Sequence, residues 1–181
     1  MKKLLFSLYK KVIKLFYGSN LSKYDIVRNT SRYMNNQLHP EFVEIEGNKI
    51  YLDENDSLFL SSSIRHEQTI VNLVKNEIKK GDVVIDIGAH IGYYTVLFAK
   101  LVGPKGKVFA FEASPSNFEI LKKNVNVNGY QNVTLNNKAV SDKNGKLTLY
   151  ITGRTSTENF LFRPENFVAS SKIKILLKLI Q

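Results

Sequence analysis

The chain has 181 residues, 43% of them hydrophobic, which is enough for one domain with a substantial core. It contains no cysteine, so a disulfide framework and a thiolate metal site are excluded, as fits a reducing cytoplasm. The formal net charge is +10, of which residues 1–20 and 172–181, with eight lysines and no acids, supply +8. Because the rest carries only +2, no nucleic-acid-binding surface is expected on the body of the protein.

Residues 1–18 form a lysine-rich amphipathic stretch. Its apolar side chains share one helical face: Leu5, Leu8, Tyr9, Val12 and Phe16. Three of its lysines occupy the opposite face: Lys3, Lys10 and Lys14. The stretch is too short to span a bilayer, which takes about 20 apolar residues, and lysines interrupt the apolar region that a signal peptide needs. Two alternatives stay open: a helix that lies on a membrane surface, and a helix that docks on the domain.

A connector, a hairpin and a helix are predicted next. Residues 24–40 are polar and irregular, and with the amphipathic stretch they make up a segment of residues 1–40. Residues 42–52 alternate apolar and polar side chains around Gly47-Asn48, which predicts a β-hairpin. Residues 64–80 carry apolar side chains at helical spacing and predict a helix.

The sequence V-V-I-D-I-G-A-H-I-G-Y-Y-T at residues 83–95 predicts a strand, a glycine loop and a helix. The apolar run has no polar alternation, which is typical of a strand covered on both faces. It ends at Asp86, which either caps the loop amides or belongs to a ligand site. Gly88 permits a backbone conformation that a Cβ would penalise, and Gly92 permits close approach of a ligand or of the next element. The middle glycine of a dinucleotide fingerprint is absent, which favours a ligand without a pyrophosphate.

A second apolar run, residues 108–111, ends at Glu112. A carboxylate at the tip of a neighbouring strand can accept hydrogen bonds from both hydroxyls of a ribose. A nucleoside without a pyrophosphate, held by a glycine loop and a ribose-binding acid, indicates S-adenosylmethionine. Ser114 then caps a helix that closes near Gly129.

Residues 81–151 resemble the S-adenosylmethionine-binding half of an FkbM-type methyltransferase. The matching pieces are G-D-V-V-I-D-I-G-A-H-I-G-Y-Y-T, V-F-A-F-E-A-S-P-S-N-F-E-I-L-K-K-N and N-V-T-L-N-N-K-A-V-S-D. The family usually has Asn where this chain has His90, and Pro where it has Ala113. The resemblance implies an α/β protein with the Rossmann-like fold of class I methyltransferases, in which residues 41–152 form a partial cofactor-binding domain.

The motifs and the resemblance together give a set of candidate cofactor-binding residues: Asp86, Gly88, Ala89, His90, Gly92, Tyr94, Glu112, Ala113, Glu67, Asn137 and Ala139. Glu67 has two interpretations: an acid that suits the helix dipole, or the acid that the family tends to bring to the cofactor from its N-terminal segment. Asn137 and Ala139 lie in the turn where this cofactor class usually meets adenine. Nothing near His90 in the sequence orients it as a base, so no catalytic residue is assigned. The histidines lack metal-ligand spacing, and no metal site is expected.

Residues 132–135 and 146–151 predict two more strands, and residues 153–181 are expected to be an irregular basic tail. A complete domain of this family continues with an L-D-D-like and a K-x-D-x-E-G-like element, and neither occurs here. The first strand of the sheet would then keep an unpaired inner edge, which invites self-association. Residues 173–180 either patch that edge as a strand or form a short helix. A truncated gene product is the favoured interpretation.

The leading hypothesis is an S-adenosylmethionine-dependent methyltransferase of FkbM type, which by resemblance O-methylates a sugar, a polysaccharide or a related metabolite. Its acceptor would be a small molecule or a glycan. Two alternatives stay open: an inactive remnant that binds the cofactor without transferring a methyl group, and a peripheral membrane or assembly module. The protein is expected in the cytoplasm, and at the membrane surface if residues 1–18 bind lipid.

Overall fold

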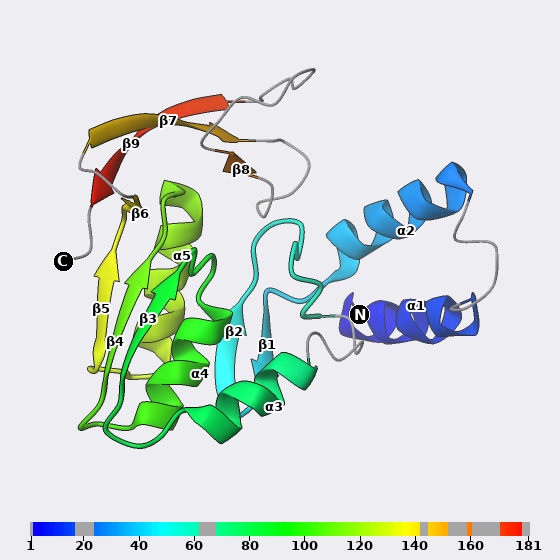
Figure 1. Cartoon of the computed structure of the whole chain (residues 1–181). Coiled ribbons are helices and arrows are strands. Elements are labelled where there is room, and N and C mark those ends of the chain that lie inside the picture. The colour runs from blue at the N-terminus through cyan, green and yellow to red at the C-terminus, as the bar shows by residue number, and fades with distance from the viewer. Residues whose placement is uncertain are drawn as a thin grey trace.

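The computed structural model shows a central α/β body, with a helical hairpin on one side and a second sheet on another (Figure 1). It describes residues 2–16, 24–61, 68–141, 145–151, 159–160 and 171–178. The helical hairpin consists of α1 (Lys2–Phe16) and α2 (Asp25–Leu38). The body contains β1 (Phe42–Ile45), β2 (Asn48–Tyr51), α3 (Gln68–Glu77), β3 (Val83–Ile87), α4 (Tyr93–Val102), β4 (Lys107–Phe111), α5 (Pro115–Val127) and β5 (Val133–Asn136). The second sheet contains β6 (Ala139–Val140), β7 (Gly145–Ile151), β8 (Asn159–Phe160) and β9 (Ser171–Lys178).

Three parallel strands in the order β3-β4-β5 form the sheet of the body. In the register, Ile87 lies beside Phe111, and Phe111 lies beside Asn136. The carboxyl ends of all three strands therefore meet at one edge. Helices α4 and α5 connect the strands, as parallel pairing requires. This arrangement confirms the predicted α/β, Rossmann-like fold.

The β1–β2 hairpin is confirmed, with its turn one residue earlier than predicted. Ile45 pairs with Asn48, so the two turn residues are Glu46 and Gly47. Both have positive φ, 53° and 74°, as expected for the two-residue turn that matches the twist of its strands. Asn48 is therefore the first residue of β2.

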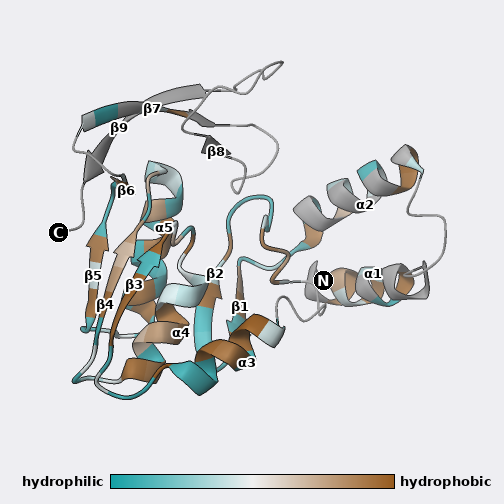
Figure 2. Cartoon of the chain, in the orientation of Figure 1, coloured by the Kyte–Doolittle hydropathy of each residue, from teal (hydrophilic) through white to brown (hydrophobic). Residues whose placement is uncertain are grey.

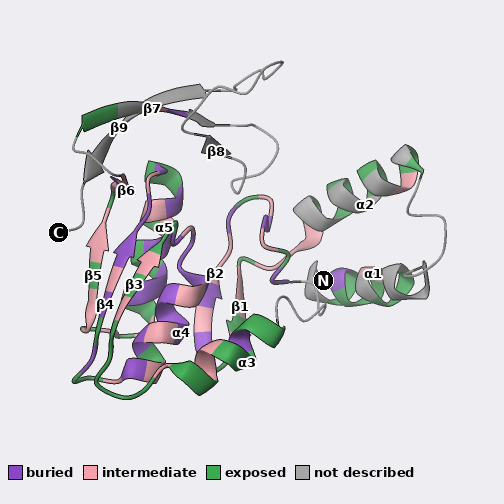
Figure 3. Cartoon of the chain, viewed as in Figure 1, coloured by how far each residue is buried: buried purple, intermediate pink, exposed green. Residues whose placement is uncertain are grey.

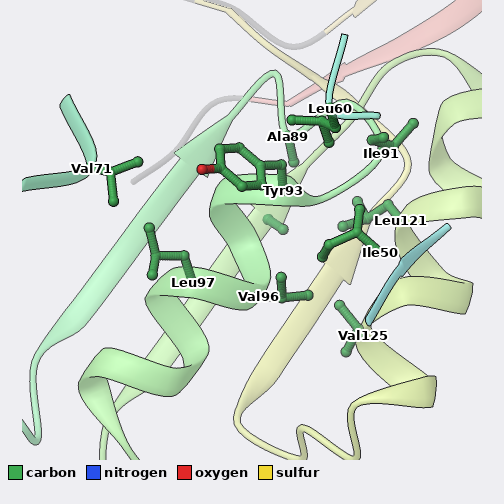
Figure 4. Close-up of a cluster of buried hydrophobic side chains, with 11 residues drawn as sticks. Ile50, Leu60, Val71, Ala89, Ile91, Tyr93, Val96, Leu97, Leu121 and Val125 are labelled. Carbon is green, nitrogen blue, oxygen red and sulfur yellow. The ribbon is translucent and has the colours of Figure 1, made fainter. Parts of the chain in front are cut away.

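The core lies where β2, α4 and α5 meet (Figure 4). Its largest fully buried apolar side chains are Ile50, Ile91, Val96 and Leu121. Leu60, from the segment after β2, and Val71, from α3, join the same cluster. The N-terminal hairpin is thus part of the domain that carries the glycine loop.

Asn124 of α5 and Asn128, the C-cap residue of that helix, bind the free edge of β2 through their side-chain amides. The Asn124 Oδ1 accepts from the Tyr51 N–H at 2.7 Å, and its Nδ2 donates to the Tyr51 carbonyl at 3.0 Å. Asn128 makes the same pair of bonds to Lys49, at 2.9 and 2.8 Å. Because residues four apart share a helix face and residues two apart share a strand edge, the two pairs match. Their amides take the place of a neighbouring strand.

Several segments differ from the sequence predictions. Residues 25–38 form α2 and pack against α1, rather than an irregular connector. Residues 171–178 form β9, rather than irregular tail. That strand pairs with β6 and β7 and not with β3, so it does not patch the edge that the sequence left open. No helix in the described part of the chain is long and apolar enough to cross a membrane.

Strand β3 is open on one side. Among the described strands it pairs with β4 alone. Its alternate residues Val83, Ile85 and Ile87 are exposed (Figure 3), although they belong to an apolar strand (Figure 2). The prediction that both faces of β3 are covered is therefore wrong for the described residues. Helix α4 packs on the face that includes Val84, whereas Val83, Ile85 and Ile87 on the other face are exposed.

Candidate functional site

The loop between β3 and α4 is fixed by hydrogen bonds to the end of β4. The backbone N–H groups of Gly88 and Ala89 both donate to the Phe111 carbonyl, at 2.9 and 3.0 Å. Gly88, His90 and Gly92 have φ values of 76°, 54° and 89°. Glycine adopts this left-handed region freely, and histidine is one of the few other residues enriched there. The loop is thus held in one conformation at the carboxyl edge of the sheet.

The two glycines of the loop have different roles. A Cβ on Gly92 would lie 2.5 Å from Cδ1 of Leu121, so the missing side chain lets α5 approach α4 closely. Of the two alternatives for Gly92, the structure selects approach of the next element. A Cβ on Gly88 would meet nothing within 4 Å, and Gly88 is exposed. Gly88 therefore leaves open space beside the backbone.

Glu112, at the tip of β4, joins the glycine loop to the start of α5. Its Oε2 accepts from the His90 N–H at 2.8 Å, and its Oε1 accepts from the Ser114 N–H at 2.8 Å. The Asn117 side chain also bonds to this carboxyl group. The Glu112 N–H in turn donates to the Asn136 carbonyl at 3.0 Å, which ties in the end of β5. The side chain is buried and held in one orientation.

The second carboxyl group of the site is Asp86, near the end of β3. Its Oδ2 accepts a 2.5 Å hydrogen bond from the Thr95 hydroxyl, which lies in α4. The loop amides donate elsewhere, those of Gly88 and Ala89 to β4 and that of His90 to Glu112. Capping of the loop amides is therefore not the role that this geometry gives Asp86.

Both carboxyl groups have a raised pKa, and the charge of Asp86 contributes to that of Glu112. Burial raises the pKa of Asp86 above its usual range, against the effect of the Thr95 hydrogen bond. Burial also raises the pKa of Glu112, opposed by the Ser114 and His90 amides and reinforced by the negative charge of Asp86. Both acids would thus be stabilised in their ionised form by a cation placed between the strand tips.

The other candidate residues are placed around these two acids. The Ala89 side chain lies in the core, and Tyr94, half-buried, stacks on Phe98. The Asn137 side chain donates to the carbonyl of Glu112 at 2.8 Å and to that of Ala113 at 3.4 Å.

One candidate, Ala139, is not at the tip of β4. Ala139 is buried in β6, where it pairs with β9, so its side chain is committed to packing. Glu67 lies outside the described residues. The site that the structure brings together thus runs from Asp86 through the glycine loop to Glu112 and Asn137.

Sequence reasoning missed several residues that hold the site in place. Thr95, Ser114 and Asn117 bond to the two acids, and Asn124 donates a 2.8 Å bond to the Ile91 carbonyl of the glycine loop. Thr95 lies nine residues after Asp86, so the two side chains meet only because the tight glycine loop folds the chain back on itself. The signal for Asn124 was its place on the apolar face of α5, where a polar side chain needs partners.

The arrangement provides a rigid polar edge with acceptors for a ligand and open space at Gly88. Both of its acids, the buried Glu112 and the half-buried Asp86, have a raised pKa. The described part of the chain does not contain three or more His, Cys, Asp or Glu side chains grouped to hold a metal ion.

The sequence that forms this edge is similar to known methyltransferases. The family model for the TRM5/TYW2 methyltransferase domain matches residues 42–168. A protein-L-isoaspartate O-methyltransferase from Ignicoccus hospitalis is 37% identical over 59 residues, which cover 33% of this chain and 28% of that protein. The hexuronic acid methyltransferase AglP from Haloferax volcanii is 36% identical over 61 residues, 34% of this chain and 24% of that protein. The chain thus spans about a quarter of the length of these two relatives.

Among solved structures, Trm5b from Pyrococcus abyssi is similar with a TM-score of 0.42 and 25% identity, covering 56% of this chain and 32% of that one. The family match includes the glycine loop, both acids and the hairpin that packs against them. The chain belongs to the TRM5/TYW2 methyltransferase domain family.

Proposed function

We propose that the carboxyl edge of the β3-β4-β5 sheet holds S-adenosylmethionine through Asp86, Gly88 and Glu112. The observation that carries the proposal is the hydrogen bond from the His90 N–H to the Glu112 carboxylate, because it fixes the two strand tips side by side. When bound, the cofactor supplies a methyl group already activated by its sulfonium. The residues of this chain need only bind and align it.

Glu112 retains the capacity to bind a ribose. An ionised carboxylate has about four acceptor sites, two on each oxygen. The backbone amides of His90 and Ser114 occupy one site on each oxygen. Asn117 takes a third site, which leaves about one acceptor site for a ribose hydroxyl. Because Glu112 is held by packing and hydrogen bonds, a ribose hydroxyl meets an acceptor that is already oriented.

The raised pKa values give the proposal an electrostatic test. S-adenosylmethionine is a cation, and a cation near Asp86 and Glu112 favours their ionised forms. Binding is therefore expected to release protons and to weaken as the pH falls through the raised pKa values. S-adenosylhomocysteine lacks the sulfonium charge, and its affinity should depend less on pH.

For the acceptor, we propose an oxygen atom of a sugar or glycan, as in methyltransferases of the FkbM type. The resemblance of residues 81–151 to that family supports this, as does the likeness to a protein named for methylating hexuronic acid. The small charge of the body, +2 outside the two lysine-rich ends, gives a nucleic-acid acceptor little to bind.

The test combines binding with transfer. Isothermal titration with S-adenosylmethionine is expected to show binding to the purified chain. Incubation with cofactor labelled at the methyl carbon should then label a uronic-acid-containing glycan, and not tRNA or a peptide containing isoaspartate. Labelling of tRNA or of the peptide instead would refute the glycan proposal and leave the cofactor site intact. No heat on titration of the folded protein would refute the cofactor site itself.

A second candidate function follows from the open side of β3. With Val83, Ile85 and Ile87 exposed, the described residues build a cofactor edge without covering the sheet beside it. The chain would then bind S-adenosylmethionine and transfer no methyl group until another polypeptide segment packs on β3. Cofactor binding with no labelled product from any of the three acceptors is the outcome that favours this candidate.

A further inference from the structure

Helix α1 carries a row of exposed apolar side chains that the domain does not use. Leu4 is 76% exposed and Leu8 is 58% exposed, and Leu5 and Val12 are also exposed. Leu4, Leu8 and Val12 follow one another at intervals of four residues, so they form one ridge. Phe6, by contrast, is buried and stacks on Tyr9. The apolar stripe of α1 is therefore wider than the part that the protein covers.

The charge around this ridge is of one sign. Residues 1–20 contain five lysines and no acid. Lys11 is exposed and lies next to Val12, three residues from Leu8, on the flank of the ridge. An exposed apolar ridge on a lysine-rich helix is the pattern of helices that lie in the plane of a membrane surface.

We propose that α1 binds the surface of an anionic lipid bilayer, with the ridge of Leu4, Leu8 and Val12 inserted among the lipids. Charge complementarity decides between occupants. A second copy would bring the same five lysines against the first five, which repel, whereas an anionic headgroup layer attracts them. The inference goes beyond the methyl-transfer function and does not rest on it.

The position of α1 allows this contact. Helices α1 and α2 pack on each other and lie on the far side of the β1–β2 hairpin from β5 (Figure 1). From Leu4 to Val12 the ridge extends about 12 Å along the helix, at roughly 1.5 Å per residue. A bilayer can therefore meet α1 along its length while the carboxyl edge of the β3-β4-β5 sheet stays in water.

The experiment is vesicle co-sedimentation of the full chain, with vesicles of phosphatidylcholine alone and of phosphatidylcholine mixed with phosphatidylglycerol. The expected result is binding to the mixed vesicles, little binding to phosphatidylcholine, and loss of binding at about 1 M salt, where the Debye length is about 3 Å. The double variant Leu4→Glu, Leu8→Glu should lose roughly tenfold or more in partitioning, because two inserted leucines are replaced by charges.

The matched control is Leu73→Glu, since Leu73 lies on a helix of the body and is 58% exposed, as Leu8 is. This variant is expected to bind vesicles as the wild type does. Far-UV circular dichroism and titration with S-adenosylmethionine check that each variant is folded, and they report on the cofactor site separately.

Three outcomes would overturn the proposal. The first is no binding of the wild type to anionic vesicles. The second is equal binding by the wild type and the Leu4, Leu8 double variant. The third is a dimer in light scattering that this double variant abolishes, with no vesicle binding, which would assign the ridge to a second copy instead.

Discussion

The side chain of Asn124 offers a direct test of how the cofactor loop is supported. It is completely buried in α5 and makes three hydrogen bonds to backbone groups: to the N–H and the carbonyl of Tyr51 and to the carbonyl of Ile91. The first two bonds hold the edge of β2, and the third holds the glycine loop. Asn124→Ala removes all three at once.

The expected loss is large relative to the stability of a domain of this size. Leaving a buried backbone group without a partner costs about 1–3 kcal/mol. The space vacated by the amide can admit water, which replaces part of the lost bonding, so we expect about 3 kcal/mol in total. Since folded domains have only about 5–15 kcal/mol of stability, this is a substantial fraction of it. The corresponding fall in Tm is roughly 6–12 °C for a chain of this length.

The assay is urea and thermal unfolding followed by circular dichroism, with Asn126→Ala as the matched control. Asn126 lies on the same helix, two residues further on, and is exposed. Both substitutions gain the same helix propensity, so the difference between the two variants isolates the buried contacts. If Asn124→Ala is within about 0.5 kcal/mol of Asn126→Ala, the amide bonds do not support the loop as described.

Two further predictions separate residues that build the site from residues that face the ligand. Gly92→Ala forces a methyl group against Leu121 and should destabilise the fold by about 2–4 kcal/mol. Gly88→Ala meets open space, so it should cost only about 1–2 kcal/mol of backbone strain and should weaken cofactor binding. Unfolding and titration of both variants check this, and equal losses of stability would contradict it. Burial raises the pKa of Asp86, so the folded protein keeps a proton that the unfolded chain has already released, and stability falls as the pH rises from the ordinary aspartate range through the raised pKa. Asp86→Asn keeps an acceptor for Thr95, so it should raise Tm at neutral pH and lose this advantage in acid. The variant should also bind the cofactor more weakly. A lower Tm than that of the wild type at neutral pH would count against this reasoning.

The central part of the fold could be predicted because its signals are local. The run of apolar residues from Val83, the glycines after it and the acid at Glu112 all lie within short windows. Each pattern has one structural solution in a parallel sheet. The observed order β3-β4-β5 agrees with the tendency of sequential βαβ units to place neighbouring strands side by side.

What could not be predicted depends on contacts between distant parts of the chain. The role of Gly92 was ambiguous in sequence, because Leu121, the residue that excludes a side chain there, lies on another helix. The partners of Asn124 and Asn128 on β2 lie 73 and 79 residues away in the chain, so the sequence around the asparagines does not show them.

The segments outside the body were missed for a similar reason. The residues of α2 include many asparagine, serine and threonine side chains of low helix propensity, and packing on α1 overrides that preference. The sequence left two alternatives for residues 173–180, a strand or a short helix, and the structure has a strand, β9, at residues 171–178. The partner was wrong, because pairing with β7 rather than β3 depends on long-range geometry.

The most direct test of the cofactor site is the affinity of S-adenosylmethionine for the wild type and for Glu112→Gln, measured by isothermal titration at neutral pH. Glu119→Gln, an exposed change on α5, is the control. The site described here predicts binding by the wild type, the same dissociation constant for Glu119→Gln, and a dissociation constant about tenfold or more higher for folded Glu112→Gln, which corresponds to about 1.4 kcal/mol. Equal affinity in all three proteins, or no binding by the folded wild type, would contradict it.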